Sequence, residues 1–294
     1  MTDIVPFTGR TLCPVESELG EGPSYDPATD TAWWFDITAR KLHELHVSSS
    51  TKRVHDLPFM GSVIATIDPS RQLIASDQGL FVRETESGKL EHFATIEDKP
   101  GNRSNDGRVH QSGALWIGTM GYNAEKDAGA IYHVAGSVVT RLFSSITIPN
   151  GICFSPDGAT AYFTDTTVND LMRVAVDPRT GLPVGAPEVL SQHKGEPGGI
   201  DGAVCDADGL IWNARWGAAT IDVYRPDGMR VRRYAVPATQ ATCPAFIGAA
   251  ADRLLVTSAW QGMDERARAA DPEAGRTFEL GIAVRGRFEP AFRL

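Results

Sequence analysis

The chain has 294 residues, of which 42% are hydrophobic and 22% are charged, the composition of a globular protein that can bury a large core. The formal net charge of −9 at pH 7 argues against nucleic acid as a partner, because nucleic-acid binders usually present a basic surface. No apolar stretch approaches the length of a membrane span, and the first residues lack the basic start and apolar run of a secretory signal. The 4 cysteines lie far apart without a CxxC pair, so we expect buried, reduced thiols in a cytoplasmic protein with no membrane partner.

A short phrase occurs six times along the chain: a turn built on Asp and Gly, followed by a hydrophobic strand that ends in Ser, Thr or Asp. The strands of the copies fall at residues 33–36, 73–77, 115–119, 162–165, 210–212 and 254–257. Neighbouring copies lie roughly 40–50 residues apart, which is the period of a four-stranded propeller blade. The sequence therefore predicts an all-β fold, a six-bladed β-propeller with four-stranded antiparallel blades, built as a single domain from residues 1–294.

Three segments outside the repeats receive their own predictions. A strand at residues 11–15 precedes the first copy, and we expect it to complete the last blade beside strands at 279–284 and 288–294. Residues 91–105 lack a repeat phrase and are predicted to form a long loop. A short surface helix is predicted at 263–270, where helix formers are polar all round and are followed by a proline.

Four short loops carry an oxygen-bearing side chain just before a repeat strand. These side chains belong to Glu21, Asn105, Asn150 and Asp201. Each loop by itself has the chemistry of an ordinary turn, since glycine lies within two residues of the polar side chain. Equivalent positions in successive blades occupy equivalent places around a propeller, however, so we expect all four side chains to face one end of the central channel.

Gathered carboxylates repel one another unless a cation compensates them. Carboxylate and amide oxygens are hard ligands, suited to Ca, Mg or Mn and, with fewer ligands, to Zn or Fe. The pattern therefore predicts one divalent metal cation at the channel and leaves its identity open. Other standard motifs are missing: the sequence has no phosphate-binding GxxxxGK[ST], no GxSxG nucleophile turn and no paired-cysteine zinc pattern.

Taken together and in this order, these motifs resemble those of the senescence marker protein, regucalcin and gluconolactonase family. The resemblance covers nearly the whole chain. It is carried by Leu19-Gly20-Glu21-Gly22-Pro23, Arg103-Ser104-Asn105-Asp106-Gly107, Leu115-Trp116-Ile117-Gly118-Thr119-Met120, Pro149-Asn150-Gly151 with Ser155-Pro156-Asp157-Gly158, Ile200-Asp201-Gly202 and Trp212-Asn213-Ala214-Arg215-Trp216-Gly217. It implies a six-bladed propeller that holds one divalent metal in its channel and, in many members, hydrolyses sugar-acid lactones.

The resemblance also implies roles, position by position. The implied metal ligands are Glu21, Asn150 and Asp201, and the implied substrate-binding residues are Arg103 and Asn105. Asp201 is in addition the candidate general base, the catalytic residue of the predicted site.

One position departs from the family pattern. Some members carry acidic residues near the substrate, where this chain has Gly121-Tyr122-Asn123. We therefore expect Tyr122 to supply the substrate contact that an acidic residue makes elsewhere. His110 stands where an Asp is common, and we expect it to be structural.

The predicted function is metal-dependent hydrolysis of a sugar-acid (aldono) lactone to the aldonic acid, with the small-molecule lactone as partner. One alternative is a calcium-binding regulatory propeller without catalysis, which the metal ligands alone do not distinguish from an enzyme. A second is a related hydrolase of aryl esters or organophosphates. The pairing of Arg103 with Asn105 favours a hydroxylated sugar, because metal storage does not need these donors. A protein-interaction propeller is disfavoured, since the Gly-His and Trp-Asp signature is missing.

Overall fold

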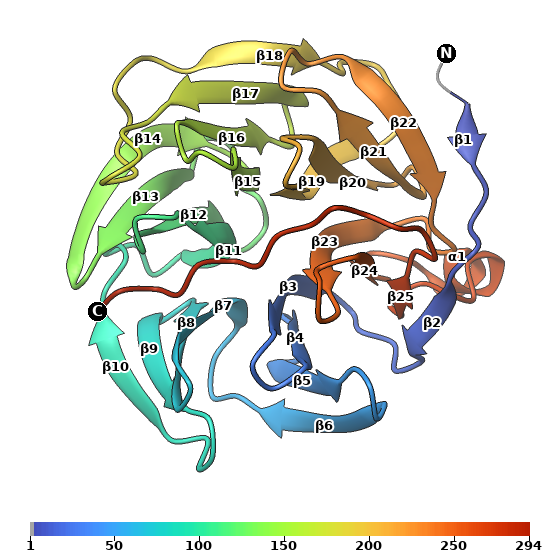
Figure 1. The fold of residues 1–294 in the computed structure, drawn as a ribbon, viewed down its shortest axis with the longest axis horizontal. Helices are drawn as coiled ribbons and strands as arrows, with labels where there is room; N and C mark the ends of the chain where they lie inside the picture. Colours follow the sequence, from blue (N-terminus) through green and yellow to red (C-terminus); the bar gives the residue numbers. More distant parts are fainter. Residues whose placement is uncertain (1–2) are drawn as a thin grey trace.

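The computed structural model describes residues 3–294, which form six small sheets around a central channel (Figure 1). The arrangement is a six-bladed β-propeller, so the predicted fold class is confirmed. In each blade the first strand lies at the channel and the next strands lead outward, and the inner strands of neighbouring blades contact each other around the ring.

Blades 1 to 4 each consist of four strands that follow one another in the sequence. Blade 1 contains β3 (Gly20–Asp26), β4 (Thr31–Asp36), β5 (Lys41–His46) and β6 (Thr51–Asp56). Blade 2 contains β7 (Gly61–Asp68), β8 (Arg71–Ser76), β9 (Gly79–Glu84) and β10 (Leu90–Ala94). Blade 3 contains β11 (Asn102–Val109), β12 (Leu115–Gly121), β13 (Gly129–Ala135) and β14 (Val138–Ile146). Blade 4 contains β15 (Pro149–Phe154), β16 (Thr160–Asp165), β17 (Asp170–Ala175) and β18 (Glu188–Gln192).

Blades 5 and 6 each include a strand from the N-terminal part of the chain. Blade 5 contains β19 (Gly199–Cys205), β20 (Ile211–Trp216), β21 (Thr220–Tyr224), β22 (Arg230–Ala235) and, parallel to β22 at the outer edge, β1 (Ile4–Val5). Blade 6 contains β23 (Ala241–Ile247), β24 (Arg253–Ser258), β25 (Thr277–Glu279) and β2 (Arg10–Cys13). The antiparallel pairing of β2 with β25 confirms that a strand near residue 11 closes the ring. Blade 5 departs from the prediction, because β1 makes it five-stranded.

Two predictions for the connections are corrected by the structure. The expected loop at 91–105 is shorter, because residues 90–94 pair with β9 as the outer strand of blade 2 and β11 already begins at Asn102. The strands expected at 279–284 and 288–294 are not formed beyond Glu279. The third and fourth positions of blade 6 are filled by β25 and β2, so the blade has its four strands without them. Residues 280–294, here called the C-terminal strap, instead cross one end of the channel (Figure 1).

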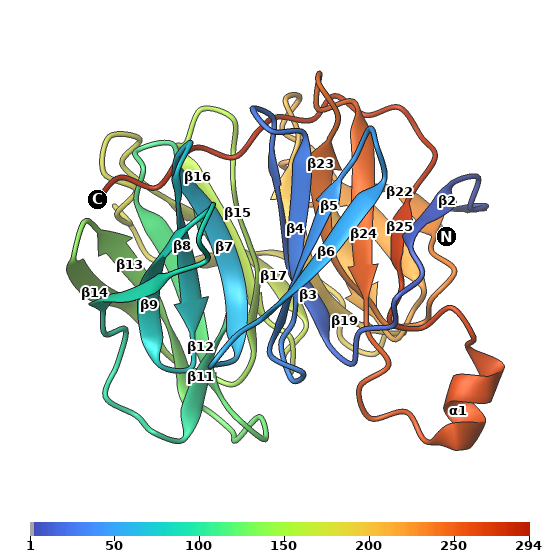
Figure 2. The same ribbon diagram turned by 90° about the horizontal axis from the view of Figure 1, so that it is seen from below.

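The predicted surface helix is present as α1 (Glu265–Ala270), in the connection between β24 and β25. The side chain of Asp264 accepts a hydrogen bond from Ala267 N and so caps its N-terminus. Figure 2 shows α1 and the C-terminal strap at opposite ends of the ring.

The core consists of six hydrophobic clusters, and each cluster joins two neighbouring blades. Strand β4 shows how the sequence achieves this: Trp33 and Phe35 pack toward blade 2, whereas Ala32 and Trp34 pack toward blade 6. Because successive side chains of a strand point to opposite faces, a strand that is buried on both sides is apolar almost throughout. The repeat phrases are therefore the strands that join the blades together.

The four cysteines are free and buried, as the sequence predicts. His110 is fully buried and bonded to Gly158 O and the Ser112 hydroxyl, which agrees with its expected structural role. Among residues 3–294 no helix has the length and apolarity that a membrane crossing requires.

Candidate functional site

The inner strands of the ring carry β-bulges at the α1 end of the channel. In β3 the ladder shifts between Glu21 and Ser24, and in β15 it shifts between Asn150 and Cys153. A bulge places two residues opposite one and re-aims the nearby side chains. Glycine makes both bulges possible: Gly22 and Gly151 have φ of 56° and 65°, in the left-handed region that other residues rarely adopt.

Blades 3 and 5 carry the same feature with an offset of one residue. Asn105 and Asp201 lie inside their bulges, whereas Glu21 and Asn150 occupy the last paired position before theirs. The four positions are thus not strictly equivalent, as the sequence comparison of the blades assumed. The bulges nevertheless bring all four side chains to one place.

That place is a cavity of about 140 Å³. Its polar walls are formed by Glu21, Arg103, Asn105, Asn150, Thr166, Asp201 and Gln261, and its apolar walls by Leu19, Met120, Ile148 and Trp216. Gln261 belongs to the connection that contains α1, which places the cavity at that end of the ring. Five of the six predicted site residues therefore line a single cavity.

Tyr122 is the exception, because it does not line this cavity. Its side chain is 40% exposed, and its hydroxyl donates a hydrogen bond to Asp77 Oδ2 at 2.9 Å. This bond joins blades 3 and 2 near the site. The structure thus places Tyr122 beside the cavity that the other predicted residues share and not in its wall.

The amide of Asn150 is oriented by Thr166. The Thr166 hydroxyl donates to Ile200 O at 2.8 Å and therefore accepts from Asn150 Nδ2 at 2.9 Å. This leaves Asn150 Oδ1 to face the other way, where Asn105 Nδ2 donates to it at 2.8 Å. A carbonyl oxygen has two lone pairs, so Oδ1 keeps one for a ligand.

Asn105 links Arg103 to Asn150. Its Nδ2 donates both hydrogens, to Asn150 Oδ1 and to Pro149 O at 3.0 Å, while its Oδ1 accepts from Arg103 Nη1 at 2.8 Å. Asn105 therefore has no free donor and can meet a substrate hydroxyl only as an acceptor. Arg103 Nη1 also donates to Ser104 O at 2.9 Å, which fixes the guanidinium at the cavity wall.

Of the two carboxyl groups of the site, Asp201 is buried and Glu21 is half-buried, and neither has a cation at contact distance among residues 3–294. Burial, together with the nearby Asp106, raises the pKa of Glu21 to about 8, and burial together with the Glu21 charge raises the pKa of Asp201 well above its ordinary value. Neither forms an ion pair with another residue in the part of the chain that is described, 3–294. Burial lowers the pKa of Arg103 to about 10, so this group remains a cation at neutral pH.

Within residues 3–294 no group of three or more His, Cys, Asp or Glu side chains is placed to hold a metal ion. The predicted set differs in composition, because it combines two carboxylates with the Asn150 amide oxygen. Its oxygens are hard donors, and its two carboxyl groups have no cation at contact distance within residues 3–294, so the residues present fit a divalent cation.

The family described as the "SMP-30/Gluconolactonase/LRE-like region" matches residues 19–260. The chain belongs to this family. It is 74% identical over 294 residues, 100% of both chains, to a putative sugar lactone lactonase of Rhizobium meliloti (strain 1021). It is 33% identical over 284 residues, 95% of this chain and 93% of the relative, to an L-arabinolactonase of Azospirillum brasilense. The solved structure of regucalcin from Agrobacterium tumefaciens str. C58, described as a calcium-binding protein, superposes with a TM-score of 0.99 at 60% identity over 100% of both chains.

The family resemblance predicted from the motifs is thus confirmed. Asp106 is a further residue of the site region that the sequence pattern did not single out. This carboxylate accepts hydrogen bonds from Ile152 N at 2.7 Å and from Gly107 N at 2.9 Å, and it therefore ties blade 3 to the bulge that carries Asn150. The signal was available, because Asp106 directly follows Asn105 in one of the quoted motifs.

Proposed function

We propose that the protein hydrolyses the ring ester of a sugar-acid lactone to the open aldonic acid, with the help of one divalent cation. The relatives named as lactonases establish the enzyme class that the sequence predicts. The observation that supports the cation most directly is the pair Glu21 and Asp201. These half-buried and buried carboxyl groups, from blades 1 and 5, line one cavity without an ion-pair partner among residues 3–294.

Glu21, Asn150 and Asp201 are the residues that would hold the cation, and Thr166 orients the Asn150 oxygen toward it. When bound, such a cation supplies a Lewis acid for the lactone carbonyl and lowers the pKa of nearby water. The apolar walls of Leu19, Met120, Ile148 and Trp216 restrict bulk water, which strengthens every electrostatic interaction inside the cavity.

The protein's own groups account for the proton and for the orientation of the ring. Asp201 accepts a proton from the attacking water and returns it to the ring oxygen that leaves. The Arg103 guanidinium donates to the lactone oxygens and stabilises the negative charge that develops on the carbonyl oxygen. Asn105 holds Arg103 in place and accepts from a substrate hydroxyl with the remaining lone pair of Oδ1.

The reaction can be tested directly, because ring opening releases acid. We expect the protein to release acid from freshly dissolved aldonolactones well above the spontaneous rate, as followed with a pH indicator. A chelator is expected to abolish this activity, and an excess of divalent cation to restore it. The panel should include an aryl ester and an organophosphate, since turnover of these alone would identify the aryl-ester or organophosphate hydrolase instead.

A calcium-binding propeller without catalysis is the second candidate, supported by the regucalcin structure that is described as a calcium-binding protein. The same ligands serve both functions. Calcium binding by calorimetry, combined with no chelator-sensitive acid release from any lactone, would decide for this candidate and against hydrolysis.

The cation should also counteract the pH dependence of stability. The pKa of Glu21 is raised from 4.5 to about 8, so the folded metal-free protein keeps a proton that the unfolded chain has released. Metal-free stability is therefore expected to fall as the pH rises from about 4.5 to about 8. Added cation replaces that proton and should raise the melting temperature more at pH 8 than at pH 5. Melting curves with chelator or with excess calcium measure this. In the control Glu21→Gln the difference should become smaller, because Asp201, whose pKa burial also raises, is still present. Equal increments at both pH values would contradict the prediction.

A further inference from the structure

A second cavity, of about 150 Å³, lies between blades 2 and 3 at the same end of the ring. Its walls include Asp77, Lys99, Ser104 and Thr119, and Arg103 lines it as well as the site cavity. A ligand that contacts Arg103 in the site cavity therefore has a second cavity beside it.

Strand alternation explains why two cavities flank one blade. Thr119 and Met120 are neighbours in β12, and they face opposite sides of the sheet. Met120 lines the site cavity, whereas Thr119 lines the second cavity. The arrangement of the second cavity is thus fixed by the same strand that forms part of the reaction site.

The Thr119 hydroxyl is the unusual feature of this second cavity. The side chain is 2% exposed, and Oγ1 has no hydrogen-bond partner within residues 3–294. Nearby hydroxyls are satisfied: Ser104 Oγ bonds with Ser62 Oγ at 2.7 Å, and Ser76 Oγ donates to Gly79 O at 2.9 Å. A buried hydroxyl without a partner is costly, so a ligand that supplies the partner gains affinity.

Asp77 forms another part of the wall and accepts hydrogen bonds. Asp77 Oδ1 accepts from Met60 N at 3.0 Å, and Asp77 Oδ2 accepts from the Tyr122 hydroxyl at 2.9 Å. Each oxygen keeps a lone pair that faces no recorded donor. Tyr122 therefore acts on this cavity indirectly, by holding Asp77.

The charges of the walls define the chemistry of the occupant. Acceptors are provided by Asp77 and Glu97, and donors by Lys99, Arg103 and Thr119. A hydroxyl group donates and accepts at once and suits both kinds of wall. An anionic group would meet the acidic side chains, and an apolar chain would leave the polar walls without partners.

We infer that the second cavity is the subsite for the hydroxyl-bearing exocyclic chain of the lactone, and that Thr119 binds a hydroxyl of this chain. The inference rests on the proposed function and extends it to substrate choice. Tetrono-, pentono- and hexono-1,4-lactones carry no, one and two exocyclic carbons, and kcat/KM should rise along this series.

The test is Thr119→Val, which keeps the shape of the side chain and removes its hydroxyl. We expect kcat/KM for the hexonolactone to fall about fivefold through an increase in KM, because one hydrogen bond to the exocyclic chain is lost equally from the ground state and the transition state. The value for the tetronolactone, which has no such chain, should change less than about twofold. Thr119→Ser should restore the preference. Ser17→Ala is the matched control, since Ser17 Oγ is also buried without a recorded partner in the described chain but lines neither cavity.

Two results would overturn the inference. An equal loss for all three lactones would show that Thr119 is merely structural, and no loss for any would show that the cavity holds only water. If the wild-type protein turned over none of them, the proposed function would fail, and calorimetry of the corresponding aldonates would still decide the subsite. Hexonate must then bind more tightly than tetronate, and Thr119→Val must remove the difference.

Discussion

Changing Asp201 to Asn is expected to lower kcat about a thousandfold at saturating divalent cation, the usual contribution of a general base. The amide has the size of the carboxylate but cannot accept a proton from water. It also removes one of the two charges proposed to hold the cation, so cation affinity should fall as well. Initial rates must therefore be measured over a range of cation concentrations and extrapolated to saturation.

The same variant should be more stable than the wild type when metal is absent. Asp201 is 4% exposed, and its pKa is raised by burial and by the Glu21 charge, so its ionised form destabilises the metal-free fold. Asn removes this cost, and we expect the melting temperature in chelator to rise by roughly 2–4 °C per kcal/mol gained. A loss of activity with a gain of stability is the combination that a merely structural residue would not produce.

Arg103→Ala is the matched comparison. It should lower turnover while the affinity for the cation stays nearly unchanged, because the proposed role of Arg103 is to contact the substrate and not the cation. Near-normal turnover of Asp201→Asn at saturating cation would refute the assignment of the general base, and loss of cation binding in Arg103→Ala would make Arg103 structural.

The fold was predictable because it rests on local signals. Asp-Gly turns mark the ends of strands, and an almost fully apolar strand such as β4 indicates burial on both faces. Their repetition fixed the number of blades. Ring closure by β2 was also predictable, since an unpaired strand at the start of a propeller needs an edge.

The remaining features depend on three-dimensional geometry that the local sequence does not determine. The offset between Glu21 and Asn105 arises from where each bulge begins, and the role of Thr166 arises from a hydrogen bond to Ile200 in the next blade. The segment after Glu279 has the composition of a strand, but the third and the outer positions of blade 6 are taken by β25 and β2. Sequence patterns report the preference of a segment and not the availability of a partner.

The C-terminal strap therefore does not extend a blade, and its contacts show its structural role. It donates hydrogen bonds to main-chain oxygens of four different blades. These oxygens belong to Thr66, Gly113, Phe154 and Cys205. Phe292 is 1% exposed and packs into the cluster between blades 2 and 3. The strap thus ties several blades together at the end of the channel opposite α1 (Figure 2).

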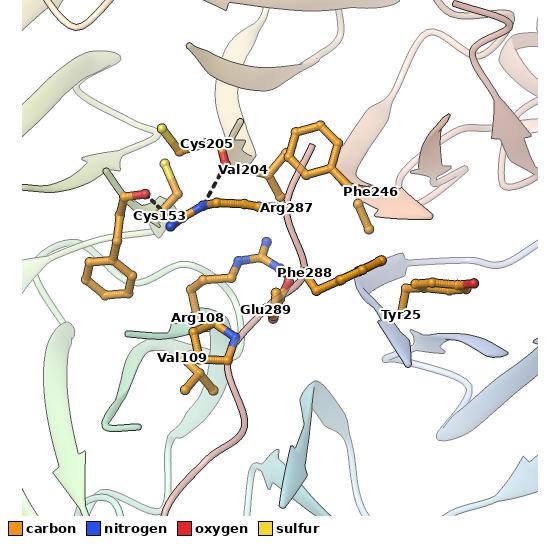
Figure 3. A pocket seen from close by; sticks show the side chains of 13 residues that line it. Tyr25, Arg108, Val109, Cys153, Val204, Cys205, Phe246, Arg287, Phe288 and Glu289 are labelled. Atoms are coloured by element: carbon orange, nitrogen blue, oxygen red, sulfur yellow. Dashed lines mark hydrogen bonds and ion pairs between the residues drawn. The ribbon is translucent and has the colours of Figure 1, made fainter. Parts of the chain in front are cut away.

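Figure 3 shows the centre of this contact, where Arg108 and Glu289 face each other inside the ring. Arg108 is 7% exposed and also donates to Ala203 O at 3.1 Å. Burial lowers the pKa of Arg108, but the Glu289 carboxylate outweighs this effect and holds the pKa above its ordinary value. Only a cavity of about 30 Å³ remains beside the pair, so the strap closes this end of the channel.

Deleting residues 284–294 is expected to remove most of the stability of the fold. Removing one partner of a buried ion pair lowers the free energy of unfolding by about 3–5 kcal/mol, and removing a buried Phe side chain lowers it by about the same amount. The total free energy of unfolding of a typical protein is only about 5–15 kcal/mol. We expect the truncated chain to melt at least about 15 °C lower or to fail to fold. Glu289→Gln keeps the contact without its charge and should lose only part of this, while Phe292→Ala tests the apolar contribution alone. Circular dichroism melting curves measure all three, and an unchanged melting temperature in the truncated chain would show that the blades hold the ring closed without the strap.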